Sequence, residues 1–206
     1  HIQNALGYPS LEYAHLPLVL GNDKKRLSKR HAATNLEEYR NLGYLDSAIL
    51  NTLARLGWSK GEKEVFYIDD LVKDFSLSDV QKAGAIFDIS KLNYLNIQHM
   101  AKLTLEDFTD NLKPHLKDLN IDINLHPKAR ELIEAMRTSA STLSGIAKNL
   151  FCYFNEISEF DEKAIQKFVI GSENILLELK EEIARLGDWD EPSIDSALTE
   201  YREKNN

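Results

Sequence analysis

Residues 143–154 read Leu-Ser-Gly-Ile-Ala-Lys-Asn-Leu-Phe-Cys-Tyr-Phe and carry the most regular helical pattern in the chain. Their apolar side chains return every three or four positions, so on a helix they line one face. This stripe consists of Leu143, Ile146, Ala147, Leu150, Phe151 and Phe154. A stripe of this kind is typical of a helix that packs into a core, and it indicates that helix packing is the basis of the fold.

Similar spacing continues on both sides of this stretch. Asp46 is expected to cap a helix that stops at Gly57, and Thr104 with Asp107 forms a predicted capping box. Pro114 is expected to kink or split the helix that contains it. Helices are expected at 46–56, 68–75, 89–100, 105–119, 128–139, 143–154, 161–169, 173–186 and 192–203. With a short apolar strand at 16–20 and a loop at 120–127, the predicted fold class is mainly α, with one or two short strands near the N-terminus.

Composition narrows the kind of protein further. Apolar residues make up 43% of the 206 residues, which is ordinary for a globular chain, and no run is long enough to cross a membrane. The single cysteine, Cys152, excludes an internal disulfide, fits a reducing cytoplasm and is expected in the core. The chain starts at His1, without a signal peptide or targeting helix, and this start is interpreted as an internal cut.

Charge is distributed unevenly along the chain. The net charge is -8, which by itself argues weakly against a nucleic-acid partner. Residues 1–60 nevertheless hold eight Lys or Arg against five Asp or Glu, whereas residues 155–206 hold six against fourteen. The capacity to bind phosphate is therefore concentrated near the N-terminal end.

Most of that positive charge lies in one short stretch, residues 23–31, where five of nine residues are Lys or Arg. The stretch follows a turn, so an exposed loop that meets a polyanion is one interpretation. In that loop Leu27 would anchor the chain, Ser28 would donate a hydrogen bond, and Lys29 and Arg30 would project charge. Composition alone favours the simpler alternative, a solvated basic turn.

The order of these residues is more specific than their charge. Arg26-Leu27-Ser28-Lys29-Arg30 resembles the KMSKS signature of class I aminoacyl-tRNA synthetases, and with His31 it resembles the form found in bacterial glutamyl-tRNA synthetases. Stretches similar to that family also lie at 14–21, 39–45, 51–59, 87–92 and 95–96. The resemblance spans roughly residues 1–160, and beyond them it rests on helical pattern.

The resemblance implies a ligase that forms glutamyl-adenylate from ATP and passes glutamate to tRNA(Glu). It implies Lys29 as the catalytic, ATP-contacting residue, with Arg26, Leu27, Ser28 and Arg30 completing the ATP-binding loop. The tRNA-contacting candidates are Arg40, Arg55 and Lys60. Mg would accompany ATP in the full enzyme, which is expected to be a cytoplasmic monomer.

Three regions follow from the same resemblance. Residues 1–25 correspond to the end of the catalytic domain, 26–100 to the KMSKS loop and the helices that contact the tRNA stem, and 101–206 to a helical anticodon-binding domain. The HIGH motif, the glutamate pocket and the last anticodon domain are expected outside this chain. The family carries about eight more residues at the join between Asn4 and Ala5, which is interpreted either as a deletion or as a gap in the sequence.

Other interpretations remain open at this point. The chain could be a free-standing helical module that binds tRNA without catalysis. A glutaminyl-specific relative is disfavoured, because bacterial members of that branch carry a β-barrel anticodon domain and the pattern after residue 100 is helical. Histidine and cysteine spacing suggests no metal site. Trp58, Tyr94 and Phe151 could stack on bases, but core packing is the favoured interpretation for all three.

Overall fold

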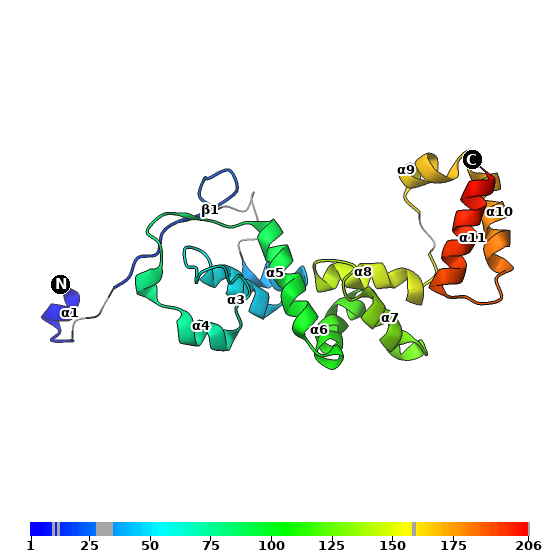
Figure 1. Ribbon diagram of the computed structural model, residues 1–206. Coiled ribbons are helices and arrows are strands. Elements are labelled where there is room, and N and C mark those ends of the chain that lie inside the picture. The colour runs from blue at the N-terminus through cyan, green and yellow to red at the C-terminus, as the bar shows by residue number, and fades with distance from the viewer. Residues whose placement is uncertain (10, 12, 28–34, 158–159, 206) are drawn as a thin grey trace. The chain divides into compact units, whose positions relative to one another are not determined.

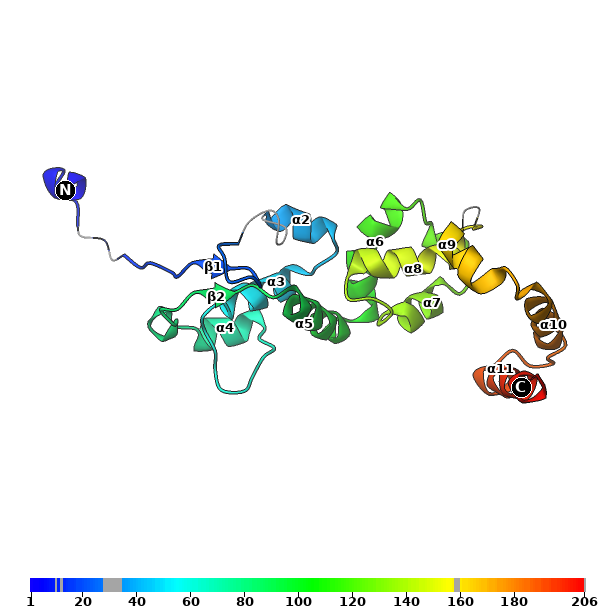
Figure 2. The ribbon, with the colours of Figure 1, turned by 90° about the horizontal axis from the view of Figure 1, so that it is seen from above.

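The computed structural model describes residues 1–206 except 10, 12, 28–34, 158–159 and 206. It contains two compact units, His1–Glu156 and Ile157–Asn206, each of which is described by itself. Helices dominate both units (Figure 1). The strands found in the described residues form one two-stranded sheet and lie next to each other in Figure 2. The predicted fold class, mainly α, is confirmed. Within the described residues, no helix is both long and apolar enough to span a membrane.

The first unit begins with a short helix, α1 (Ile2–Ala5), and with strand β1 (Val19–Leu20). β1 pairs in parallel with β2 (Ala85–Ile86), so that Val19 lies opposite Ala85 and Leu20 opposite Ile86. The strand predicted at 16–20 is therefore confined to its last two residues. Only these two residues find a partner strand, and Leu16 and Leu18 stay exposed.

The first helical group consists of α2 (Leu36–Asn41), α3 (Asp46–Ala54), α4 (Ile68–Asp74), a 3-10 turn (Leu77–Asp79) and α5 (Ile89–Lys102). α3 and α5 lie side by side in both views (Figure 1 and Figure 2). The cap of α3 is Leu45 and not Asp46, so the prediction of Asp46 as the cap was wrong by one residue. Gly57 lies beyond the helix end, in a left-handed conformation (φ +92°) that favours glycine.

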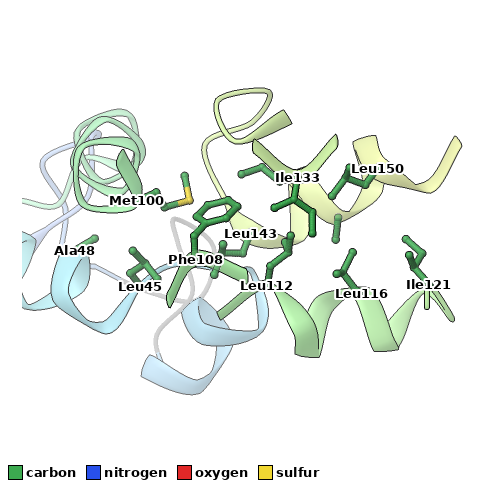
Figure 3. Packing of buried hydrophobic residues seen from close by; sticks show 12 residues of the cluster. Leu45, Ala48, Met100, Phe108, Leu112, Leu116, Ile121, Ile133, Leu143 and Leu150 are labelled. Carbon is green, nitrogen blue, oxygen red and sulfur yellow. The ribbon is translucent and has the colours of Figure 1, made fainter. Parts of the chain in front are cut away.

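The second helical group consists of α6 (Leu105–Asp118), a 3-10 turn (Ile123–Leu125), α7 (Ala129–Met136) and α8 (Leu143–Phe154). Figure 3 shows side chains of α6 pointing toward side chains of α7 and α8 across one apolar core. The labelled members from these helices are Phe108, Leu112, Leu116, Ile133, Leu143 and Leu150. Thr104 caps α6, since its Oγ1 accepts from the Asp107 N–H at 3.1 Å, as the sequence predicted.

The sequence predicted a kink or a split at Pro114, and the split is absent, since α6 runs unbroken from Leu105 to Asp118 with the exposed proline inside it. The prediction for Cys152 was wrong. Cys152 is exposed and not a core residue. The buried stripe of α8 contains Leu143 and Leu150, and at about 100° per residue position 152 points away from that stripe.

The second unit contains α9 (Glu162–Ala164), a π-helical turn (η3, Ile165–Val169), α10 (Glu173–Ala184) and α11 (Glu191–Lys204). The Tyr201 hydroxyl of α11 donates to Glu178 Oε2 of α10 at 2.9 Å. Helices were predicted at these places, although the first of them changes from α to π geometry at Ile165. None of the described residues in this unit is buried.

Candidate functional site

The basic stretch begins on a tight hairpin that grows out of β1. The Gly21 N–H donates to the Lys25 carbonyl at 2.8 Å, and the Leu27 N–H donates to the Val19 carbonyl at 2.9 Å. Lys24 makes the reversal with a positive φ of 59°. We call residues 19–27 the cationic hairpin. Its backbone geometry is fixed by these hydrogen bonds, and the strand on which it grows is held in turn by β2.

The charged side chains of the cationic hairpin face solvent. Lys24, Lys25 and Arg26 are all exposed. Among the residues that the structure describes, no carboxylate lies within ion-pair distance of any of the three. Three cations on neighbouring positions repel one another, so the hairpin presents a positive field that favours an anionic partner.

Leu27 connects the hairpin to the body of the unit. It is partly buried and packs against a cluster made of Tyr39, Tyr44, Ile49, Phe87 and Leu92. Complete burial of a leucine side chain contributes about 1.5–3 kcal/mol relative to full exposure, and the partly buried Leu27 gains a part of this. The hairpin is therefore anchored by an apolar contact at the point where its charged arm begins. Ser28, Lys29, Arg30 and His31 lie outside the described residues, so the roles expected for them stay predictions.

The three cations predicted to contact tRNA are spread over separate segments, and each has a carboxylate partner. Arg40 on α2 lies 3.3 Å from Asp46, and both side chains are largely exposed. Lys60 pairs with Asp74. The Asp74 side chain is only 16% exposed, so this pair is partly buried. Exposed ion pairs contribute only about 0.2–1 kcal/mol, so a phosphate can replace Asp46 beside Arg40 at little cost.

Arg55 differs from the other two candidates. Its side chain is only 16% exposed, and its Nη1 lies 3.0 Å from Glu64 Oε1. The same oxygen of Glu64 lies 2.8 Å from the Lys91 ammonium. The neighbouring charges of Lys91 and then of Arg55 hold the pKa of the Glu64 carboxyl below its ordinary value. Lys91 was missed in the sequence, because it is remote in sequence from the residues it joins.

The aromatic candidates divide into buried and exposed residues. Trp58 is buried against Phe66, with ring centroids 5.0 Å apart, which confirms the core interpretation. That interpretation was wrong for Tyr94 and Phe151, which are 45% and 37% exposed. Tyr94 lies beside the buried positions of α5 and not among them, while Phe151 sits at the edge of the α8 stripe.

Titratable clusters elsewhere in the described residues are structural. His99 is buried, its Nε2 lies 3.1 Å from Asn51 Oδ1, and burial lowers its pKa. No group of three His, Cys, Asp or Glu side chains suited to a metal ion occurs in the described part of the chain. The cationic hairpin is thus the feature here that points most directly to chemistry.

Comparison with known proteins assigns the two halves of the chain. A family described as "tRNA synthetases class I (E and Q), catalytic domain" matches residues 1–94, and one described as "Anticodon binding domain" matches residues 107–206. "Glutamate--tRNA ligase 2" of Halorhodospira halophila is 36% identical over 204 residues. The chain belongs to the glutamate–tRNA ligase family. "Glutamate--tRNA ligase" of Geobacter sulfurreducens is 35% identical over 201 residues.

Solved structures of glutamate–tRNA ligases share the fold of this chain. The Elizabethkingia meningosepticum enzyme, crystallised with its amino acid, aligns with a TM-score of 0.70 at 30% identity over 99% of this chain. The Elizabethkingia anophelis enzyme aligns with a TM-score of 0.67 at 30% identity over 98%. The chain covers 43% of the two curated relatives and 44% of these two structures. The anticodon-binding match continues to residue 206, beyond residue 160, where the family motifs quoted from the sequence end.

Proposed function

We propose that the protein to which this chain belongs attaches glutamate to tRNA(Glu) through a glutamyl-adenylate made from ATP. In this proposal the chain contributes the loop that closes over ATP and the helices that hold the tRNA. Support comes chiefly from one observation. In a member of the glutamate–tRNA ligase family, an exposed cationic hairpin is anchored by Leu27 at the position of the KMSKS-like sequence.

The proposed chemistry places the hairpin against the leaving pyrophosphate. When glutamate attacks the α-phosphate of ATP, negative charge builds on the β- and γ-phosphates. A cation that meets this charge stabilises the transition state more than the ground state, by roughly 3–4 kcal/mol for one well-placed group. Lys29 is the proposed catalytic residue, Arg26 and Arg30 supply supporting charge, and Ser28 holds the loop. Mg²⁺ bound with ATP would neutralise further phosphate charge.

The proposed tRNA contacts use the exposed cations beyond the hairpin. Arg40 has an exposed ion pair that a phosphate can replace, and the Lys60 side chain is itself exposed, so both fit contacts that orient the RNA without reading its sequence. Arg55 fits less well, because Glu64 and burial hold it in place.

We further propose a division of the chain into three regions. Residues 1–25 are part of the catalytic domain, residues 26–100 are the loop and stem-contact region, and residues 101–206 are the anticodon-binding domain. The whole protein is proposed to be a cytoplasmic monomer.

The alternative is a helical module that binds tRNA without catalysis. The catalytic-domain match over residues 1–94 supports the ligase instead. A glutaminyl-specific relative with a β-barrel anticodon domain is disfavoured by the helices α6 to α8 and α10 to α11.

Pyrophosphate exchange by the whole protein, with glutamate and tRNA present, separates these proposals. We expect Lys29→Ala to slow exchange by about 10²–10³-fold while the tRNA Kd changes less than twofold. The matched control is Lys117→Ala, an exposed lysine on α6, which should leave both quantities unchanged. A parent protein that binds tRNA but shows no exchange would establish the non-catalytic module, and an unchanged rate in Lys29→Ala would remove its catalytic role.

A further inference from the structure

Three segments of the first unit meet where the two family matches adjoin. They are residues 42–45, which follow α2, the middle of α5 at Asn96, and residues 141–144, where α8 begins. The first segment belongs to the catalytic-domain match and the last to the anticodon-domain match. We call these three segments together the clasp.

Asn96 is the polar centre of the clasp. Its side chain is fully buried. The Oδ1 atom accepts from the Leu45 N–H at 2.9 Å, and the Nδ2 group donates to the Ser141 carbonyl at 2.7 Å. The Asn96 amide thus bonds to the Leu45 N–H in the catalytic-domain match and to the Ser141 carbonyl in the anticodon-domain match, and so joins the two. Such a network is rigid when complete and costly when a member is lost.

The outer segments of the clasp also touch each other directly. The Leu143 N–H, at the start of α8, donates to the Gly43 carbonyl at 2.9 Å, and Ser144 Oγ donates to the Leu42 carbonyl at 2.6 Å. A Cβ atom at position 43 would lie 2.4 Å from the Ser144 backbone nitrogen. Gly43 also has a φ of +87°, so both the close approach and the backbone conformation require glycine.

The next residue along the chain connects the clasp to the cationic hairpin. Tyr44 is buried in the cluster on which Leu27 packs. Its hydroxyl donates to Asn93 Oδ1 at 2.6 Å, one helical turn before Asn96 on α5. A continuous series of packed and hydrogen-bonded groups therefore runs from Leu27 through Tyr44 and Gly43 to the N-terminus of α8.

We propose that the clasp holds α8 at a fixed distance from the region that carries the cationic hairpin, so that one tRNA meets both surfaces at once. Gly43 and Asn96 are its positioning residues. Two binding surfaces on a rigid support act together, because contact with one raises the effective concentration of the other. The proposal rests on the proposed function for the RNA contacts of both surfaces, whereas the rigidity of the joint is independent of it.

The first test measures the rigidity of the joint without RNA. Cys152, the single cysteine, is exposed on α8 and accepts a spin label. A second label is placed on α4 through Asp69→Cys, at an exposed position. We expect a narrow distance distribution in the parent chain and a clearly broader one in Gly43→Ala and Asn96→Ala. Gly61→Ala is the matched control, since Gly61 also has a positive φ (57°) but no atom within 4 Å of a new Cβ.

The second test measures tRNA(Glu) binding across salt concentrations, at temperatures where circular dichroism shows every variant folded. We expect about tenfold weaker binding in Gly43→Ala and Asn96→Ala, with a shallower salt dependence because fewer phosphates are engaged at once. Gly61→Ala should match the parent. Should Gly43→Ala and Asn96→Ala fail to fold, Ser144→Ala removes one bond of the clasp without filling space, and it should weaken binding in the same direction.

The outcomes separate this proposal from the proposed function. Distance distributions that stay narrow in the clasp variants would overturn the rigid joint. Broadened distributions with unchanged tRNA affinity and salt dependence would reduce the clasp to a purely structural feature. A parent chain without salt-dependent tRNA binding would overturn the tRNA role of the clasp together with the proposed recognition of tRNA, even where the distance measurement shows a rigid joint.

Discussion

The guanidinium carbon of Arg137 lies 4.9 Å from the ring centroid of Phe108, so a charged group from the end of α7 covers an aromatic core residue of α6. The same guanidinium donates from Nη2 to the Met100 carbonyl at 2.6 Å and to the Leu103 carbonyl. These carbonyls lie at the end of α5, where the last carbonyls run out of intrahelical donors. The Met100 carbonyl also accepts from the Leu103 N–H at 3.2 Å. A single arginine therefore closes the end of α5 and joins the three helices.

Arg137→Lys should destabilise the first unit by about 1–3 kcal/mol, because an ammonium cannot reproduce the planar fork that reaches both carbonyls and the Leu103 carbonyl loses its guanidinium donor. Urea unfolding, followed by the fluorescence of the buried Trp58, measures the free energy of unfolding of this unit. Arg130→Lys, at an exposed position of the same helix, is the control and should stay within about 0.5 kcal/mol of the parent. Equal stabilities for the two variants would contradict the capping role.

Tyr39 and Tyr44 form a matched pair for a second prediction. Both are buried in the cluster that anchors Leu27, with ring centroids 5.7 Å apart. The Tyr39 hydroxyl has no hydrogen-bond partner in the structure as described, whereas the Tyr44 hydroxyl donates to Asn93. We expect Tyr39→Phe to leave stability unchanged or raise it by up to about 1 kcal/mol, and Tyr44→Phe to lower it by about 1 kcal/mol. Urea unfolding in which Tyr39→Phe is the less stable variant would refute the assignment.

The Tyr39 hydroxyl also predicts a loss of stability in alkaline solution. Burial, with smaller contributions from Tyr44 and Glu38, raises its pKa from 10.0 to about 12. The folded chain then holds this proton more tightly than the unfolded chain, so its contribution is complete below pH 10 and is lost as the pH rises toward 12. Tyr39→Phe should therefore reduce the drop in unfolding free energy between pH 10 and 12. Parallel pH profiles for Tyr39→Phe and the parent would show that this group does not contribute.

Local patterns in the sequence were sufficient for the helices from α3 onward and for most of their inward faces, whereas the short helices α1 and α2 were not among the predicted ones. The α8 stripe predicted the buried residues Leu143, Ile146, Ala147 and Leu150, because a 3.6-residue period maps directly onto a helix face. Individual residues at the margins of a stripe were harder to place. Cys152 and Phe151 have apolar neighbours in sequence and are nevertheless exposed. Burial of a helical residue depends on its angular position around the helix axis and not on the residues next to it in sequence.

Contacts between distant residues could not be predicted from local pattern. The basic stretch was recognised from its order of residues, and nothing in that order showed that Arg55 is held by Glu64 or that Lys91 shares the same carboxylate. The clasp is a similar case, since Gly43 and Ser144 are about a hundred positions apart and meet only in the folded unit. Such relationships depend on how helices pack, which periodicity does not specify.

The shared carboxylate leads to a last prediction, about the strength of RNA binding. Glu64 pairs with both Arg55 and Lys91, at 3.0 Å and 2.8 Å, and offsets one of their two positive charges. Glu64→Gln keeps the size of the side chain but removes its charge, so the two cations would gain an uncompensated positive charge near the proposed tRNA surface. We expect tRNA(Glu) to bind two- to fivefold more tightly, with a salt dependence steeper by about one phosphate contact, because each neutralised phosphate releases counterions.

Filter binding of the chain to tRNA(Glu) across salt concentrations measures both quantities. Glu62→Gln is the matched control, since Glu62 is exposed, lies two residues away and removes the same formal charge. If both variants tighten binding equally, the effect comes from net charge alone and the Arg55–Glu64–Lys91 group has no special role. If Glu64→Gln weakens binding instead, the carboxylate is needed to hold Arg55 and Lys91 in a geometry that the RNA uses.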